Sequence, residues 1–219
     1  MTLIEVLGRR NSANVQKVMW TLGELGVDYI RRDIGGSFGY PDDYPNPVAV
    51  VPTIRDGDIT VWESGACVRY LARTYGAGSL WPEDPAELAT ADMWMEWHRS
   101  EISNAFFPLF QAKIRGLPIP EEKQVQMVSD CGRIFTQLDA QLEGKDFICG
   151  SNLTIADMVN GAIMFRYMTL EIERPSLPNV EAWYARLVAR PAYEKHVMVE
   201  YGKNPEEWAA AEAANARIQ

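Results

Sequence analysis

The sequence predicts a mixed α/β domain followed by an all-helical domain. In the first 80 residues, short apolar runs alternate with helical patterns. Gly, Ser and Pro then cluster at residues 76–85, and no convincing strand pattern follows them. We therefore place one domain at residues 1–80, a second at residues 87–205, and an Ala/Glu-rich tail at residues 206–219.

The first domain should have the order β-α-β, long loop, β-β-α. Apolar runs predict strands at residues 3–7 and 27–34, with a helix between them that ends at Gly26. Residues 35–47 are rich in Gly, Pro, Asp and Tyr and indicate a loop. Asp56-Gly57 is a strong hairpin turn signal between short strands at residues 53–55 and 59–62, and residues 64–75 have a helical pattern.

The second domain should consist of helices. Residues 85–116 form a long helical segment in which Pro108 predicts a kink. Apolar residues recur at three- and four-residue steps over residues 121–143. Thr154 and Asp157 have the spacing of a capping box. A further helix covers residues 178–190 and ends before Pro191.

Composition excludes several classes of function. A net charge of −9 argues against nucleic acid as the main partner, since phosphate binding needs a basic surface. The three cysteines form no C-x-x-C pair and the two histidines lie far apart, so we expect no metal site. No apolar run approaches the roughly 18 residues of a membrane span, so we expect a cytoplasmic protein without a membrane partner.

Two dipeptides suggest a binding site. Pro52 stands just before a short strand, where proline is tolerated only at an edge, at a strand start or in a cis turn. Glu63-Ser64 places a carboxylate, a hydroxyl and the free N–H groups of a helix start in one patch. Such a patch suits an amino-acid zwitterion, because the helix start binds its carboxylate and Glu63 its ammonium.

The order and spacing of these motifs resemble the glutathione S-transferase family, over roughly residues 1–200. The resemblance depends on the segment from Asn46 to Pro52, on Trp62-Glu63-Ser64 with Arg69-Tyr70-Leu71, and on the stretches 151–157 and 190–193. It implies a thioredoxin-like N-terminal domain, an all-α C-terminal domain and a homodimer. It also implies a detoxification enzyme that activates glutathione as a thiolate for attack on a hydrophobic electrophile.

The resemblance implies where glutathione binds. Val51 would pair its backbone with the cysteinyl part of glutathione beside a cis Pro52, as in strand addition at a sheet edge. Glu63 and Ser64 would hold the γ-glutamyl end. Relatives often carry a His or Lys just before the Val-Pro pair, whereas this chain has Ala49 and Val50. The glycyl carboxylate would therefore need another cation, and Arg9 and Lys17 are candidates.

Catalysis would require a donor that keeps the thiol ionised. Lowering a thiol pKa by about two units takes about 2.7 kcal/mol of preferential stabilisation, which a hydroxyl or amide donor and a helix start can supply. Two family patterns fit residues 8–18, and they place Ser12 or Asn14 at the sulfur. We rank Ser12 first, Asn14 second and Asn11 third. The alternative is that Ser12 only caps the helix.

An electrophile site would lie between the domains, on the first long helix of the second half and on a later helix. Its candidate residues are Trp97, His98, Glu101, Phe107 and Tyr167, although aromatic residues at helical spacing also build cores. Two alternative functions remain open: a glutathione-binding scaffold or regulatory protein with little turnover, and a glutathione-dependent isomerase or dehalogenase.

Overall fold

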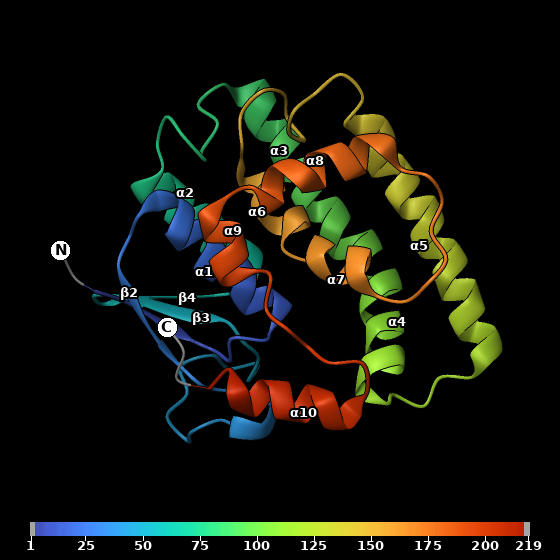
Figure 1. Ribbon diagram of the computed structural model, residues 1–219. Coiled ribbons are helices and arrows are strands. Elements are labelled where there is room, and N and C mark those ends of the chain that lie inside the picture. The colour runs from blue at the N-terminus through green and yellow to red at the C-terminus, as the bar shows by residue number, and fades with distance from the viewer. Residues whose placement is uncertain (1–2, 217–219) are drawn as a thin grey trace.

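The first domain contains one small sheet covered by two helices. A computed structural model describes residues 3–216 of the chain (Figure 1). The first-domain elements are β1 (Ile4–Leu7), α1 (Ala13–Leu25), β2 (Tyr29–Arg32), the short helix η1 (Gly36–Phe38), β3 (Thr53–Asp56), β4 (Ile59–Trp62) and α2 (Ser64–Tyr75). These positions confirm the predicted order, with β2 shorter than expected and one helical turn inside the predicted loop.

The sheet has the strand order β2-β1-β3-β4. β1 pairs in parallel with β2, and the connection between them is α1, because parallel neighbours need a crossover. β3 pairs antiparallel with both β1 and β4, and the β3–β4 turn contains Gly57 at φ 58°. In Figure 1 the sheet lies at the lower left, with α1 and α2 above it. Their apolar residues form one core with the sheet, which includes Val6, Val18 and Leu71.

The described part of the second domain consists of helices joined by loops. Its elements are α3 (Pro85–Trp97), η2 (His98–Ile102), α4 (Ser103–Arg115), α5 (Glu121–Gln141), α6 (Ile155–Gly161), α7 (Met164–Thr169), α8 (Pro178–Val188), α9 (Pro191–His196) and α10 (Pro205–Ala214). The capping box at the start of α6 is confirmed: the Thr154 hydroxyl accepts from the N3 backbone, and Asp157 Oδ2 accepts from the Thr154 N–H at 2.8 Å.

The first long helical segment is irregular at a different place from the one expected. Residues His98–Ile102 form a π-helical turn between α3 and α4, whereas Pro108 lies inside α4. Such wide turns often occur at functional sites, because they redirect a side chain. Here the turn begins at His98, which faces the first domain and hydrogen-bonds Lys17 of α1.

The two domains share α1. One face of α1 packs on the sheet, while Ala13 and Trp20 belong to the core of the helical domain. Trp20 packs edge-to-face on Tyr193 of α9, with 4.9 Å between the ring centroids. The start of α1 therefore lies between the two domains.

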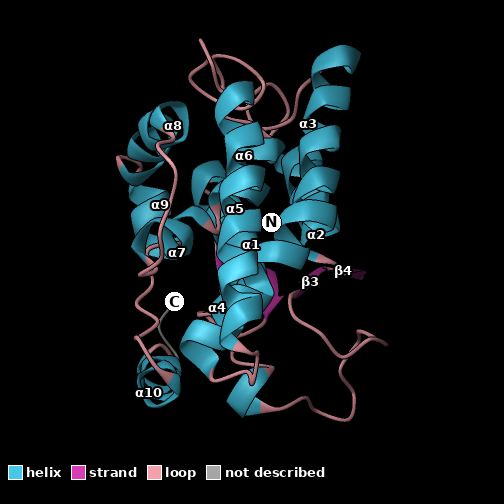
Figure 2. Ribbon diagram, turned by 90° about the vertical axis from the view of Figure 1, so that its right-hand side faces the viewer, coloured by secondary structure: helices cyan, strands magenta, loops and turns pink. Residues whose placement is uncertain are grey.

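Helix α10 returns from the helical domain to the first domain. Figure 1 shows it crossing the bottom of the molecule, beside the loop that follows β2, and Figure 2 shows it below α7 and α9. Trp208 and Glu212 of α10 are buried. Glu212 accepts a hydrogen bond from the Ser37 N–H at 3.1 Å and forms an ion pair with Arg9 at 2.8 Å.

Residues 3–216 lack two kinds of feature. None of their helices combines the length and the apolar character needed to cross a bilayer. No group of three or more His, Cys, Asp or Glu side chains in this range is arranged to hold a metal ion.

Candidate active site

Within residues 3–216, the start of α1 presents donors that have no partner. Ser12 occupies the N-cap position, with φ −81° and ψ 122°, but its hydroxyl makes no capping hydrogen bond. A serine at this position usually accepts from the N2 or N3 N–H, so a hydroxyl that does not cap is free to act elsewhere. The helix start adds its own positive partial charge and unpaired N–H groups. Together they favour an anion in front of Ser12.

Asn14 is oriented by two neighbours. Its Oδ1 accepts from Lys17 Nζ at 3.0 Å and from Ser64 Oγ at 3.3 Å. Because both neighbours are donors, the atom that they contact is the amide oxygen, and Asn14 Nδ2, which has no hydrogen-bond partner within residues 3–216, can donate to a ligand. This arrangement also ties the start of α1 to the start of α2.

The Val51–Pro52 peptide bond is cis, as expected. Within residues 3–216, the backbone N–H and C=O of Val51 have no hydrogen-bond partner. The preceding carbonyl, that of Val50, is held by Tyr44 Oη at 2.8 Å and Asn46 Nδ2 at 2.9 Å. Val51 therefore offers an unpaired backbone just before the start of β3, which suits the addition of an extended ligand.

Glu63 has a strained backbone. Its φ is 69°, in a region that residues other than glycine rarely adopt and that costs of the order of 1–3 kcal/mol. This conformation occurs at the N-cap of α2, directly before Ser64, whose hydroxyl reaches Asn14. Strain of this kind persists where the surrounding structure fixes a functional side chain.

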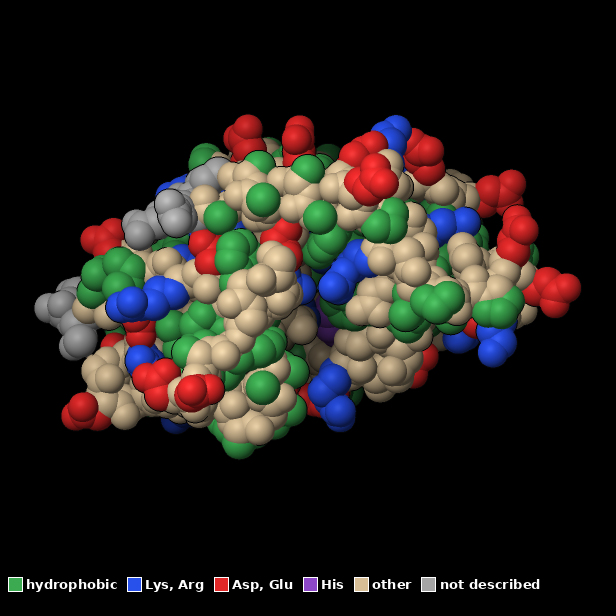
Figure 3. Space-filling view, turned by 90° about the horizontal axis from the view of Figure 1, so that it is seen from below, with side chains coloured by type: hydrophobic (Ala, Val, Ile, Leu, Met, Phe, Trp, Pro, Cys, Tyr) green, Lys and Arg blue, Asp and Glu red, His purple; other side chains and the backbone are tan. Residues whose placement is uncertain are grey.

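Two cavities meet at Asn14. The first, which we call the Lys17 cavity, has a volume of about 480 Å³, and its lining includes Asn14, Lys17, Glu63, Ser64 and His98. The second, which we call the Arg166 cavity, has a volume of about 200 Å³, and its lining includes Arg9, Asn11, Ser12, Asn14, Phe107, Phe110, Arg115, Arg166 and Trp208. Seen from below, the molecule is hollowed between its two domains, with Lys and Arg side chains at the rim (Figure 3).

Lys17 is a buried cation in contact with a buried histidine. Its Nζ lies 2.9 Å from His98 Nε2, and only 3% of the residue is exposed. Burial lowers the pKa of Lys17 to about 7, and the Glu63 carboxylate partly opposes this shift. Burial, together with the neighbouring Lys17, holds the pKa of His98 well below its ordinary value, so His98 is neutral and accepts from the ammonium.

The structure brings together most of the predicted residues. Asn11, Ser12, Asn14 and Phe107 line the Arg166 cavity with Arg9, and Lys17, Glu63, Ser64 and His98 line the Lys17 cavity. Lys17 thus lies beside Glu63 and Ser64, at the predicted γ-glutamyl end. Arg9 lies near the loop at residues 35–40. It forms an ion pair with Glu212, and Glu212 accepts a hydrogen bond from the Ser37 N–H of this loop.

Three predicted pocket residues lie outside both cavities. Tyr167 is 1% exposed and stacks on Phe135, with 3.7 Å between the ring centroids, so it belongs to the core of the helical domain. Trp97 donates from Nε1 to Gln137 on α5, away from α1. Glu101 lies in the π-helical turn but lines neither cavity. Of the predicted aromatic residues, Trp97 and Tyr167 therefore pack within the helical domain, whereas Phe107 lines the Arg166 cavity.

Several lining residues were missed from sequence. Arg115 and Arg166 come from α4 and α7, and Trp208 comes from the predicted tail. Arg166 had a detectable signal, because it is a lone charge in the apolar run from Ala162 to Met168. Trp208 had a weaker one, since a single tryptophan in an Ala/Glu-rich stretch marks the buried side of a helix.

Comparison with known proteins identifies the family of the chain. The family model for the N-terminal domain of glutathione S-transferases matches residues 11–74, and the model for their C-terminal domain matches residues 98–191. The chain is 34% identical to glutathione S-transferase GstB of Escherichia coli over 207 residues, which cover 90% of this chain and 99% of the relative. It is 30% identical to a probable glutathione S-transferase, GSTF2, of rice, over 89% of this chain and 96% of that one.

A solved structure is similar over nearly the same range. The theta class glutathione S-transferase of Xanthomonas axonopodis pv. citri, with glutathione bound, has a TM-score of 0.86 and 38% sequence identity. The match covers 91% of this chain and 99% of the other. The chain therefore belongs to the glutathione S-transferase family. It is an enzyme of that class, as its motifs predicted.

Proposed function

We propose that this protein conjugates glutathione to a small hydrophobic electrophile, with Ser12 as the main donor to the thiolate. The observation that carries the proposal is the hydroxyl of Ser12 at the N-cap of α1, which makes no capping hydrogen bond within residues 3–216 and belongs to a residue that lines the Arg166 cavity. Asn14, with its amide nitrogen free, is the second donor. Asn11 is the third, because its buried side-chain amide has no partner within residues 3–216.

Binding would use both ends of the tripeptide. The unpaired backbone of Val51, beside the cis Pro52, supports pairing with the cysteinyl part. Glu63, Ser64 and Lys17 in the Lys17 cavity support contacts with the ammonium and carboxylate of the γ-glutamyl group. The sulfur would then lie in front of the α1 start, between the two cavities that share Asn14.

The chemical step is stabilised-nucleophile catalysis. The bound thiol loses its proton to solvent, and the thiolate accepts a hydrogen bond from Ser12 while facing the positive end of α1. The sulfur electron pair forms a bond to the electrophilic carbon. In a displacement the leaving group departs with its bonding pair, and in an addition the product takes up a proton.

A thiol titration tests the role of Ser12. The pKa of bound glutathione, measured from thiolate absorbance, should rise by about one to two units in Ser12→Ala and return toward the wild-type value in Ser12→Thr. If Ser12 only caps α1, the alanine variant will lose about 1 kcal/mol of stability and leave the thiol pKa unchanged. The same titration of Asn14→Ala ranks the second donor.

We also propose a cytoplasmic homodimer with a role in detoxification. The free cysteines Cys67, Cys131 and Cys149 support a reducing compartment. Exposed apolar side chains, among them Ile59 at 50% and Met93 at 62%, support a protein partner surface. Light scattering coupled to size exclusion distinguishes a dimer near twice the 24.7 kDa chain mass from a monomer.

A further inference from the structure

Arg166 is a buried cation without a carboxylate partner. Only 4% of the residue is exposed, and within residues 3–216 no Asp or Glu oxygen forms an ion pair with it. Its guanidinium donates to the Asn11 carbonyl at 2.6 Å and to Gln16 Oε1 at 3.3 Å. Burying an uncompensated charge costs several kcal/mol, so such a group needs a reason to be retained.

Two more guanidinium groups lie close to it. Arg9 and Arg115 both line the Arg166 cavity, and their charges, added to the effect of burial, lower the pKa of Arg166 to about 9. Arg9 is paired with Glu212, but Arg115 has no ion pair within residues 3–216. Three positive charges therefore face one negative charge around this cavity.

The same cavity has an unsatisfied amide and aromatic walls. Both polar side-chain atoms of Asn11 are buried and have no partner within residues 3–216, although buried polar groups are normally hydrogen-bonded. Phe107, Phe110 and Trp208 line the cavity, and the guanidinium of Arg166 lies 5.0 Å from the Phe110 ring centroid. The volume of about 200 Å³ is of the size that holds one substituted aromatic ring.

We propose that the Arg166 cavity binds the acidic group of an aromatic electrophile, so that this enzyme prefers electrophiles that carry a carboxylate or sulfonate. This inference rests on the proposed conjugation and names its substrate class. Arg166 and Arg115 neutralise the acidic group, Asn11 donates to it, and the aromatic side chains hold the ring beside Ser12. Guanidinium groups suit this task, because their donors match two carboxylate oxygens at once.

Glutathione itself carries a carboxylate that could occupy the cavity. Its glycyl end has no assigned cation, and Arg9 was a sequence candidate for that role. The cavity, however, is lined by neither Val51 nor Pro52, and neither Glu63 nor Ser64 contributes to it. The residues that would align glutathione thus lie on the other side of Asn14, which favours the electrophile as the occupant.

A matched pair of electrophiles tests the proposal. The chosen pair is 2-chloro-1,3-dinitrobenzene, which is neutral, and 4-chloro-3,5-dinitrobenzoate, which adds one carboxylate para to the chlorine. In both, the thiolate forms the carbon–sulfur bond and chloride leaves with the bonding pair. The kcat/KM of each, divided by its uncatalysed rate constant, should favour the benzoate by about tenfold or more, since a charge-assisted contact is worth about 1.4 kcal/mol or more. An equal or lower normalised value for the benzoate overturns the proposal.

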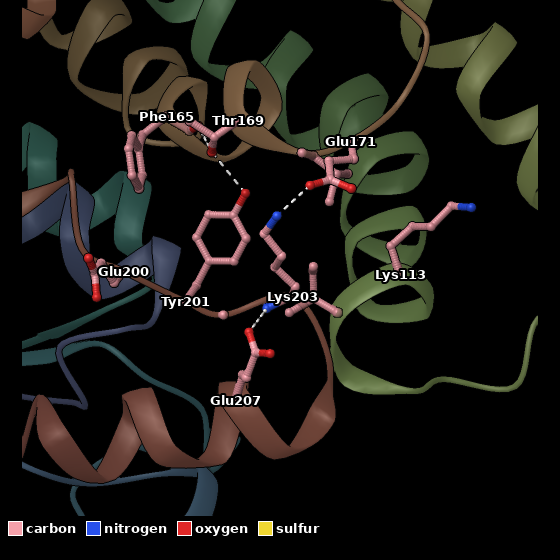
Figure 4. A pocket seen from close by; sticks show the side chains of 11 residues that line it. Lys113, Phe165, Thr169, Glu171, Glu200, Tyr201, Lys203 and Glu207 are labelled. Carbon is pink, nitrogen blue, oxygen red and sulfur yellow. Dashed lines mark hydrogen bonds and ion pairs between the residues drawn. The ribbon is translucent and has the colours of Figure 1, made fainter.

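Two variants on α4 locate the effect. Arg115→Gln removes an exposed cation of the cavity and should lower the normalised kcat/KM of the benzoate about tenfold, while that of the neutral compound changes less than twofold. Lys113→Gln is the control, because it removes the same charge two residues away. Figure 4 shows Lys113 lining a different cavity, where the Lys203–Glu171 pair and the Tyr201–Thr169 hydrogen bond lie. Equal effects of the two variants overturn the proposal.

Two further measurements complete the test. The first distinguishes a site for the electrophile from a site for the glycyl carboxylate of glutathione. The second measures binding to the cavity separately from the conjugation reaction. If the cavity holds the glycyl carboxylate, Arg115→Gln will raise KM for glutathione equally with both electrophiles, and the proposal fails. If neither compound turns over, conjugation of such electrophiles is refuted, and binding decides the cavity separately. With S-methylglutathione present, 3,5-dinitrobenzoate should bind at least tenfold more tightly than 1,3-dinitrobenzene, and Arg115→Gln should abolish the difference. Equal binding of both compounds overturns the proposal.

Discussion

Lys17 Nζ and His98 Nε2 lie 2.9 Å apart in a buried contact that joins α1 of the first domain to the π-helical turn of the second. The contact borders the Lys17 cavity, where we propose that the γ-glutamyl group of glutathione binds. Since burial lowers the pKa of Lys17 to about 7, the charge on this lysine responds to any anion that enters.

We therefore expect proton uptake when a glutathione analogue binds. S-methylglutathione has no thiol to titrate, and its carboxylate should raise the pKa of Lys17 from about 7. Calorimetry in buffers of different ionisation enthalpy measures the number of protons taken up on binding. This number should approach one at pH 8 and fall to near zero at pH 5. Affinity should weaken as the pH rises above 7.

Lys17→Met is the control for this effect. In this variant the uptake at pH 8 should vanish and affinity should become flat between pH 7 and pH 8. Uptake that persists in Lys17→Met would show that another group takes the proton.

The same lysine should make folding stability depend on pH. Its pKa is about 7 in the folded state and 10.5 in the free side chain, so the unfolded chain binds more protons between these two values. Stability should therefore rise as the pH increases from 7 toward 10.5. Lys17→Met should remove this rise. It should also increase the free energy of unfolding at pH 7 by about 1–3 kcal/mol, a net value that includes the loss of the lysine's hydrogen bonds. Urea unfolding at pH 7 and pH 9 measures both effects, and a destabilised variant with an unchanged pH dependence would contradict the expectation.

Asp157 should be the most costly carboxylate to remove. Its oxygens accept from the backbone N–H groups of Ile148 and Thr154 and from Trp183 Nε1, all between 2.8 and 3.0 Å. Asp157→Ala leaves these buried donors unpaired and should cost about 3 kcal/mol or more. Asp146→Ala is the control, because this exposed residue only pairs with Arg186 and should cost less than about 1 kcal/mol. Similar midpoints in urea would refute the role of Asp157.

Asp157 should also contribute an acid-side pH dependence. Burial raises its pKa to about 6, above the ordinary value of 3.8. A carboxyl group with a raised pKa binds more protons when folded, so its contribution to stability is greatest below pH 4 and is lost as the pH rises to 6. This slope should be absent in Asp157→Asn. It can be measured from urea midpoints at pH 4, 5 and 6.

Gly161 should tolerate no side chain. A Cβ there would lie 2.8 Å from Leu187 Cδ1 and 2.9 Å from two ring carbons of Trp20, at the contact between the domains. Gly161→Ala should therefore destabilise by about 1–3 kcal/mol, although alanine favours helix. Gly132→Ala in α5 is the comparison, because its Cβ would meet only the ring of Pro175, at 3.3 Å and beyond. A thermal shift no larger for Gly161→Ala than for Gly132→Ala would contradict this packing.

The sequence was most informative where a feature depends on local chemistry. The turn at Asp56-Gly57, the capping box at Thr154 and the start of α2 at Ser64 are each set by neighbouring residues, and all three were placed correctly. The π-helical turn at His98 was missed, because no residue type marks such a turn in a sequence. Proline differs, because its missing N–H removes a helical hydrogen bond, so Pro108 could be recognised as a possible kink.

The candidate site was predictable from sequence only where its residues belong to local motifs. Ser12, Asn14, Glu63 and Ser64 come from motifs with fixed spacing, so they could be read along the chain. Arg115, Arg166 and Trp208 meet only through the packing of α4, α7 and α10, and no local pattern links them. Tyr167 was expected in the pocket and lies in the core of the helical domain, because helical spacing does not say which side of α7 faces the core.

The contact between Arg9 and Glu212 connects the Arg166 cavity to a late part of the chain. Helix α10 carries Trp208 into this cavity but does not line the Lys17 cavity. If the Arg166 cavity holds the electrophile, as we propose, mutational drift in α10 changes which electrophiles react, while the proposed contacts with glutathione stay constant. Paralogues that diverged in this helix alone would form a set of enzymes with one shared co-substrate and different targets.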